Sequence, residues 1–450
     1  MPPRLQTSAS VHQDTFAPAW NNFAPLQAEP TMGCGASSAA ARPARTADAA
    51  SKDSSFVKRR LSLFQEAPLL PEPPEVDDDD EPSTSQRAID ESRFIDDGVS
   101  FRRGTKFKHG LLVAPGNTDG TEVEAAAMQT ALQSSDGRFP PDTYGMLSRH
   151  GTRPGAYGPV SKINQDRACL ALHPRDSTMM VAAVFDGHGH NGGLCSQFTM
   201  HSVLEVLLCD DLVTGDAPEA LLRTAVLNAE KSLLHSSNIA AKKSGTTANV
   251  VILHPQIGLL VGNVGDSRAV LARSSGTHGT LAVDLSEDHK PDSPAESERI
   301  IAAGGFVTQS DPSTGPSRVY FASTRHSGPG LAMSRSVGDF GAKQVGVTAE
   351  PEIRRCERSP DDQFLIIASD GVWEFITSQE AVDMVVDAVA RAGENAVPAA
   401  CKQLITESRR RWEVEEGAYC DDITALIVDL RSHDQVRKKA SSDGVNAQKQ

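Results

Sequence analysis

Short apolar runs that end in acidic turns are the main pattern in the middle of the chain. Met179 to Phe185 and Phe364 to Ser369 are apolar almost throughout, and they lead into Asp186-Gly187 and Asp370-Gly371. Runs of this length predict strands that are buried on both faces, and the glycine allows a sharp turn after each strand. Each strand would deliver a carboxylate to the rim of a sheet.

Other segments predict further strands and helices. Thr247 to Leu253, Ile257 to Val264 and Arg268 to Arg273 predict three strands, which we expect to form an antiparallel meander. Ile423 to Leu430 predicts the last buried strand, directly after Asp421-Asp422. Helices are predicted over residues 192–210, 217–236, 293–303, 378–392 and 396–413.

These patterns are confined to one part of the chain. Residues 1–138 are rich in Ala, Pro, Ser and Asp with little apolar periodicity, so we expect a mostly disordered N-terminal extension. Residues 139–432 predict one large catalytic domain, and residues 433–450 predict a disordered C-terminal tail.

Charge and cysteine usage restrict the class of protein. The 450 residues carry a formal net charge of -15, which argues against nucleic acid as a partner. The seven cysteines are an odd number without C-x-x-C spacing and indicate reduced thiols. No apolar stretch approaches the ~18 residues of a membrane span, and the first thirty residues lack a secretory apolar core. We expect a cytoplasmic monomer.

Five acidic residues stand at the starts or ends of predicted strands: Asp166, Asp186, Asp266, Asp370 and Asp421. Any one of these corners could be a plain turn, but several beside apolar strands favour a shared site. Carboxylates at one rim repel each other unless cations neutralise them, and oxygen ligands favour Mg²⁺ or Mn²⁺. Two ions about 3.5–4 Å apart can share a hydroxide that attacks phosphorus. The sequence therefore predicts metal-assisted phosphoester hydrolysis.

Eight motifs follow one another over the predicted domain, and together they resemble the metal-dependent Ser/Thr protein phosphatases of the 2C type. The motifs are Asn164–Arg167, Val184–Gly189, Ser244–Ala248, Gly262–Val270, Asp288–Pro291, Pro329–Asp339, Ile367–Trp373 and Asp421–Thr424. The resemblance implies an α+β fold, a four-layer α/β/β/α sandwich in which helices flank a central antiparallel β-sandwich. It also implies hydrolysis of phosphoserine and phosphothreonine in phosphoprotein substrates.

The resemblance assigns metal ligands by motif position. Asp186 would bridge two ions, and the carbonyl of Gly187 would complete one coordination sphere. Asp370 and Asp421 would bind the other ion, and Asp166 would act through a water.

Further roles come from the same resemblance. Asp266 and Glu374 would hold a weaker third ion together with Asp370. His188 occupies the place of a general acid for the departing Ser or Thr oxygen, and a histidine near its ordinary pKa can donate that proton.

Two positions depart from the family pattern. Gln165 stands before Asp166 where many members have Glu. The arginine expected five residues before Asp166, which would grip phosphate, is replaced by Ser161, with Lys162 next to it. Lysine acts as a point charge and cannot form two parallel hydrogen bonds to phosphate as arginine does. Lys162 is therefore a weaker candidate for phosphate binding than an arginine would be.

Three alternatives remain open from the residues. His188 and His190 in Asp-Gly-His-Gly-His could form a zinc or copper site, although no Cys or third His lies nearby. A catalytically weak 2C-type fold could act as a binding or regulatory module. A metal-dependent nuclease would use similar carboxylates, but it normally shows a basic substrate track.

The termini contain candidate modification sites. Met32-Gly33-Cys34-Gly35-Ala36-Ser37 fits N-myristoylation of Gly33 with palmitoylation of Cys34, provided that translation starts at Met32. Two acyl chains would attach the protein to a membrane surface, where one chain binds only marginally. Ser62 and Ser441 follow basic residues and resemble sites of basophilic kinases.

Overall fold

A computed structural model describes residues 111–114 and 142–432, apart from residues 177, 210–217, 277–278, 312–314, 322–329 and 394. Every described residue belongs to one unit, within residues 53–450. The predicted C-terminal tail and most of the predicted N-terminal extension lie outside the described residues. So do Gly33, Cys34, Ser62 and Ser441.

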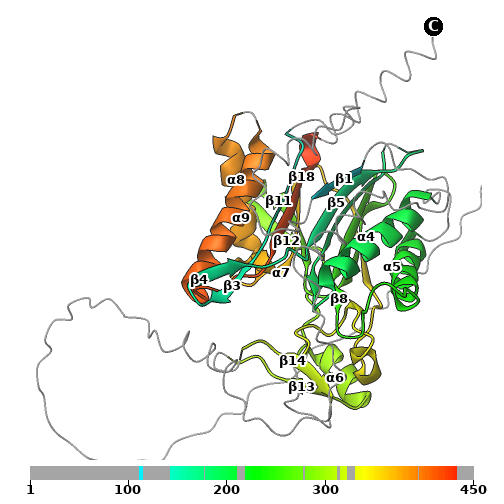
Figure 1. The fold of residues 1–450 in the computed structure, drawn as a ribbon. Helices are drawn as coiled ribbons and strands as arrows, with labels where there is room; N and C mark the ends of the chain where they lie inside the picture. Colours follow the sequence, from blue (N-terminus) through cyan, green and yellow to red (C-terminus); the bar gives the residue numbers. More distant parts are fainter. Residues whose placement is uncertain are drawn as a thin grey trace, which may run out of the picture. The chain divides into compact units, whose positions relative to one another are not determined.

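Two antiparallel sheets form the centre of the described domain (Figure 1). The six-stranded sheet has the order β1 (Leu111–Ala114), β5 (Arg167–Leu172), β6 (Met180–Phe185), β9 (Ala248–His254), β10 (Gly258–Val264) and β16 (Glu352–Cys356). The five-stranded sheet has the order β12 (Thr280–Asp284), β11 (Arg268–Ser274), β17 (Asp362–Ala368), β18 (Ile423–Asp429) and β2 (Tyr144–Arg149).

Helices cover the outer face of each sheet. Helices α4 (Gly192–Cys209) and α5 (Pro218–Leu234) pack on the six-stranded sheet. Helices α7 (Asp370–Trp373), α8 (Ser378–Arg391) and α9 (Ala396–Glu415) pack on the five-stranded sheet. The predicted helices are thus confirmed, and the domain is an α+β four-layer sandwich.

Strand β6 shows how the layers arise from its sequence. Met180, Ala182 and Val184 belong to the apolar cluster between the two sheets. The alternate residues, Val181 and Phe185 among them, belong to the cluster beneath α4 and α5. Because successive side chains point to opposite faces, a strand in the middle of four layers must be apolar at every position. This explains the uninterrupted apolar run.

The predicted three-stranded meander is only partly correct. Strands β9 and β10 pair as expected, from Gly258 opposite His254 to Val264 opposite Ala248. Strand β11 instead pairs with β12 and β17 in the other sheet. The corner Gly265-Asp266-Ser267 therefore carries the chain from one sheet to the other. Gly265 has a φ of +97°, a backbone conformation that favours glycine.

Strand β1 was not predicted from the sequence. It pairs with β5 from Leu111 opposite Ala171 to Ala114 opposite Ala168, and it lies within the segment expected to be an extension. The six-stranded sheet thus uses residues from before the predicted domain boundary at residue 139.

Smaller elements surround the sandwich. Helix α6 (Pro294–Ala302), the hairpin β13 (Gly305–Thr308) and β14 (Arg318–Phe321), and the 3-10 helix η2 (Ala342–Val345) share a separate apolar cluster. The short strands β7 (Gly187–His188), β8 (Gly245–Thr246) and β15 (Val337–Gly338) form a three-stranded sheet, and β3 (Thr152–Gly155) pairs with β4 (Gly158–Ser161). In the part of the chain that the structure describes, no helix is long and apolar enough to cross a membrane.

Candidate active site

Strand register places the predicted acids of the six-stranded sheet at one edge. Arg167 at the start of β5 lies opposite Phe185 at the end of β6. Asp166 and Asp186, which flank these two residues, are therefore neighbours. Asp166 is fully buried, and Asp186 is partly exposed.

The five-stranded sheet supplies the matching edge. Ala368 at the end of β17 lies opposite Ala425 near the start of β18, so Asp370 and Asp421 stand at the same end. Arg268 also lies opposite Ala368, which brings the corner residue Asp266 to this end as well. Both Asp-Gly corners and all five acids thus meet at one edge of the sandwich.

Hydrogen bonds join the two sheets at this edge. Ser369 Oγ donates to Asp166 Oδ2 at 2.8 Å and accepts from Thr424 N at 3.0 Å. Asn164 Oδ1 accepts from the backbone N–H of Asp166 at 2.9 Å. The bonds of Ser369 hold Asp166 of one sheet against residues of the other.

Mutual repulsion perturbs the acids. Burial raises the pKa of Asp186 well above its ordinary value, with further contributions from Asp166, Asp370, Asp421 and Asp266. Burial and the neighbouring Asp266 and Asp421 raise the pKa of Asp370 in the same way. Burial and Asp422 raise the pKa of Asp166 to about 7. Negative charges at this spacing favour a cation among them.

The carboxylate oxygens themselves test whether metal ions fit. Asp166 Oδ1, Asp266 Oδ1 and Asp370 Oδ1 are buried and have no hydrogen-bond partner. Buried unpaired acceptors are costly, and an all-oxygen donor set suits hard divalent cations. Within the described ranges no three His, Cys, Asp or Glu side chains form a closed metal cage. The oxygen atoms of these residues are therefore of the kind that binds Mg²⁺ or Mn²⁺, although the side chains do not already surround a metal position.

Two lysines contact the acids directly. Lys162 Nζ lies 2.5 Å from Asp421 Oδ1, and Lys290 Nζ lies 2.6 Å from Asp266 Oδ2. Burial opposes the charge on Lys162, but Asp421 and Asp422 outweigh it and raise the pKa of the lysine. Burial likewise raises the pKa of Asp421, but Lys162 outweighs this effect and the net pKa is lowered. Lys162, the candidate phosphate-binding residue, is thus paired with a predicted metal ligand.

His188 is paired with an acid. Its Nε2 lies 2.6 Å from Asp339 Oδ2, while its Nδ1 is buried without a hydrogen-bond partner. Burial lowers the pKa of His188, but Asp339 outweighs burial and the net pKa is raised. His190 is exposed. The two histidines therefore do not meet as one metal site, because His188 is directed at Asp339.

The glycines of the two Asp-Gly corners are required for a different reason than expected. Neither Gly187 nor Gly371 has a positive φ. A Cβ at Gly187 would lie 2.3 Å from Gly192 O, and a Cβ at Gly371 would lie 2.0 Å from Asp422 O. Close approach of backbone, rather than an unusual turn, excludes side chains at both positions.

Asp422 has a role that sequence reasoning missed. It is buried and accepts hydrogen bonds from Gly151 N at 2.6 Å and from Gln165 N at 2.8 Å. These bonds fix the backbone of Gln165, the residue before Asp166. The adjacent acids Asp421-Asp422 were the available signal, but the sequence does not reveal which one turns inward. Glu374, the other candidate for a third ion, is exposed.

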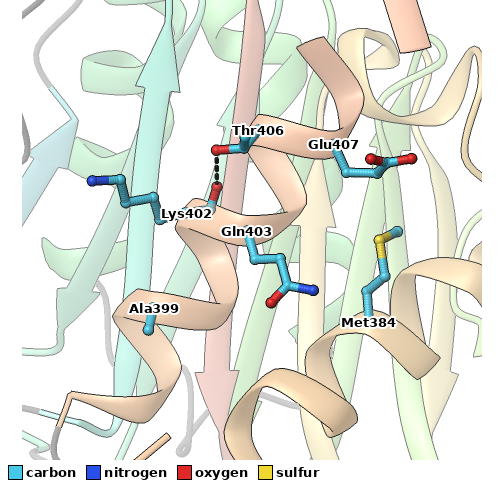
Figure 2. A pocket seen from close by; sticks show the side chains of 6 residues that line it. All are labelled: Met384, Ala399, Lys402, Gln403, Thr406 and Glu407. Atoms are coloured by element: carbon cyan, nitrogen blue, oxygen red, sulfur yellow. Dashed lines mark hydrogen bonds between the residues drawn. The ribbon is translucent and has the colours of Figure 1, made fainter. Parts of the chain in front are cut away.

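A pocket of about 500 Å³ lies away from these residues. Figure 2 shows it between α8 and α9, and its lining contains none of the predicted site residues. The lining residues are Met384, Ala399, Lys402, Gln403, Thr406 and Glu407.

Comparisons with known proteins show the family of the chain. The profile of the family described as Protein phosphatase 2C matches residues 162–415, more than half of the chain. Probable protein phosphatase 2C 35 of Arabidopsis thaliana is 37% identical over an alignment of 308 residues that covers 64% of this chain and 84% of that protein. Probable protein phosphatase 2C 34 of the same plant is 34% identical over an alignment of 352 residues that covers 74% of this chain and 94% of that protein.

A solved structure shares the fold. The crystal structure of a serine-threonine phosphatase 2C from Toxoplasma gondii has a TM-score of 0.52 and 22% identity, covering 65% of this chain and 95% of that chain. The motif order, the sandwich, the family profile and the relatives agree that this protein is a hydrolase of the protein serine/threonine phosphatase class, and the chain belongs to the protein phosphatase 2C family.

Proposed function

We propose that this phosphatase requires two divalent cations, Mg²⁺ or Mn²⁺, to hydrolyse phosphoserine and phosphothreonine in phosphoproteins. The carbonyl of Gly187 and the carboxylates of Asp166, Asp186, Asp370 and Asp421 would hold these ions. The supporting observation is that Asp166 and Asp370 each have a buried oxygen without a partner, beside other acids. When bound, the cations would neutralise phosphate charge and activate water.

A third ion would need a rearrangement at Asp266. This acid has one free buried oxygen, and its other oxygen is held by Lys290. Asp266, Asp370 and Glu374 would take such an ion only if Lys290 moved aside.

His188 would protonate the leaving oxygen of the substrate. Asp339 holds Nε2, so the unpartnered Nδ1 is the atom left for that proton. A general acid matters most when the leaving group is basic. His188→Gln should therefore lower kcat about 100-fold on a phosphoserine peptide and much less on p-nitrophenyl phosphate, whose leaving group needs no proton. Equal losses on both substrates would contradict this role.

Lys162 would assist phosphate binding as a point charge. Its ammonium lies between Asp421 and the ring of Tyr419, 5.2 Å from the ring centroid. Release from Asp421 as cations bind would make the ammonium available to phosphate.

One assay tests the main proposal. The purified chain is given a phosphopeptide, a free nucleotide and single-stranded nucleic acid, each with Mn²⁺ and with chelator. We expect phosphate release from the phosphopeptide only with Mn²⁺. Calorimetry with Mn²⁺ runs in parallel, and Asp370→Asn should abolish both release and high-affinity binding. Protein that binds Mn²⁺ but releases no phosphate would favour the binding-module alternative, and cleavage of nucleic acid would favour the nuclease.

The termini supply proposals on location and modification. If translation starts at Met32, acylated Gly33 and Cys34 would bring an otherwise cytoplasmic, monomeric enzyme to a membrane surface. Mass spectrometry of the mature N-terminus tests this, and an intact peptide across residues 29–36 as the dominant form would refute it. Ser62 and Ser441 are proposed kinase sites, which phosphopeptide mapping under kinase activation checks.

A further inference from the structure

The segment Ala240–Ser244 lies beside the His188–Asp339 pair. On one side, Asp339 N donates to Ser244 O at 2.8 Å and Gly341 N donates to Lys242 O at 2.9 Å. These bonds tie the backbone of the segment to the loop that carries Asp339.

The other side of the segment contacts the loop after His188. Asn191 N donates to Ser244 Oγ at 3.0 Å, and Asn191 Nδ2 donates to Ala240 O at 3.1 Å. A Cβ at Gly189 would lie 2.4 Å from Lys243 O, so the two backbones touch. The segment is therefore held between the two loops that position His188 and Asp339.

Lys242 and Lys243, which we call the lysine rim, are both exposed. Neither makes an ion pair with any residue in the described part of the chain. Other lysines near the site are already paired: Lys162 with Asp421, Lys290 with Asp266 and Lys343 with Glu230. The lysine rim thus adds two exposed positive charges to the segment that contacts the loops of His188 and Asp339, on a chain with a net charge of -15.

We propose that the lysine rim binds acidic residues flanking the phosphorylated serine or threonine of the substrate. This inference rests on the proposed function. A general acid stands on the leaving-group side of the phosphate, and the leaving group is the substrate polypeptide. Residues that flank the phosphorylated position therefore pass the segment Ala240–Ser244, where the lysine rim selects carboxylates by charge.

The expected preference is modest because the lysines are exposed. Exposed ion pairs are weak and are screened by salt, and two of them together correspond to about a 3- to 10-fold difference in kcat/KM. The preference should shrink as the ionic strength rises.

Three phosphopeptides test the inference. They share one phosphoserine and differ only in the flanking residues, which are acidic, neutral or basic, and each is measured with Mn²⁺. The chain should hydrolyse the acidic peptide about 3- to 10-fold better than the neutral one. The double variant K242E/K243E should reverse this order and favour the basic peptide. The matched control is Lys402→Glu, because Lys402 is an exposed lysine on α9 at the pocket of Figure 2.

Hydrolysis of p-nitrophenyl phosphate, which has no flanking residues, should be the same in all three proteins and shows that the double variant is folded. Efficient phosphopeptide hydrolysis without any flank preference, or the same preference in K242E/K243E as in the unchanged chain, would overturn the inference alone. Absence of Mn²⁺-dependent hydrolysis for every peptide would overturn the proposed function and this inference with it.

Discussion

The negative charge of the acids at the sandwich edge is unfavourable in the metal-free protein. Asp186 has four acidic neighbours that raise its pKa together with burial. Such an arrangement favours binding of cations at the expense of the stability of the metal-free protein. The lysines Lys162 and Lys290 relieve part of this repulsion at Asp421 and Asp266.

Removing one of these charges should stabilise the metal-free protein. Asp186→Asn should raise the free energy of unfolding by about 1–2 kcal/mol in chelator, because it removes repulsion among partly buried acids. With excess Mn²⁺ the order should reverse, since the unchanged chain gains stability by binding and the variant does not. Thermal melts in both conditions measure this. Asp387→Asn on the exposed face of α8 is the control, and a destabilised Asp186→Asn in chelator would contradict the argument.

The backbone of Asp339, which contacts His188, has an unusual conformation. Asp339 has a φ of +46°, which is unusual for a residue other than glycine. Its backbone N–H donates to Ser244 O at 2.8 Å, and the backbone N–H of the preceding Gly338 donates to Glu230 Oε2 at 2.7 Å. These bonds keep the Asp339 carboxylate directed at His188.

Among the elements, the two Asp-Gly corners both depend on close backbone contact. The chain at Gly187 passes against Gly192, the first residue of α4, and the chain at Gly371 passes against Asp422. These contacts hold both corners against the adjoining backbone at the acidic edge.

A side chain at the first corner should disturb both fold and activity. Gly187→Ala should lower the free energy of unfolding by about 2 kcal/mol or more, because the clash is with backbone that cannot rotate away. Urea unfolding and phosphopeptide hydrolysis measure the two effects. Gly393→Ala is the matched control, since a Cβ there meets nothing within 4 Å and its φ is not positive. Equal effects of the two substitutions would refute the steric explanation.

Helix α4 contains a pH-sensitive contact that is linked to Arg167, the residue after Asp166. Arg167 Nε donates to Gln197 Oε1 at 2.8 Å, so the Gln197 amide faces His201 Nε2, 2.7 Å away, as a donor. His201 must then accept and be neutral. Burial and the charge of Arg167 lower its pKa from 6.5 to about 4.

This contact should weaken in acid. The folded pKa lies below the unfolded one, so the unfolded chain takes up the proton first as the pH falls, and stability is lost between pH 6.5 and about pH 4. The loss should be at most about 3 kcal/mol. His201→Gln should remove this part of the pH dependence in urea unfolding at pH 7.5, 6 and 5. An unchanged pH dependence would show that His201 does not contribute.

At the scale of the whole molecule, the four layers explain why the acids meet. Two sheets of antiparallel strands stack with matching ends, and the corner at Asp266 links them. The same architecture depends on β1, a strand from outside the proposed domain of residues 139–432. We propose that the stable catalytic unit includes this strand.

Truncation tests that proposal. A chain of residues 139–432 leaves β5 as an exposed edge strand, whereas a chain of residues 109–432 keeps it paired. The shorter chain should melt about 3–6 °C lower, since it loses a four-residue ladder, and should aggregate more readily. Differential scanning calorimetry and light scattering compare the two. Equal melting temperatures would place the domain boundary at residue 139 after all.

The sequence by itself determined the most apolar strands, the long helices, the acids and the family. Apolar runs such as Met179 to Phe185 can be recognised as strands in the sequence, because a strand buried on both faces has to be apolar at each position. The acids can be recognised as candidate site residues because each adjoins a predicted strand. Motifs in family order then indicated the reaction class.

Only the tertiary structure decided which residues meet across the chain. Strand β11 joins the second sheet, Lys162 contacts Asp421, and Asp339 contacts His188 over 151 residues of sequence. Gly187 and Gly371 are required by the close backbone of Gly192 and Asp422 rather than by their own φ. Local periodicity depends on a residue's neighbours in sequence, whereas pairing and charge balance depend on neighbours in space, and a single sequence does not contain those distances.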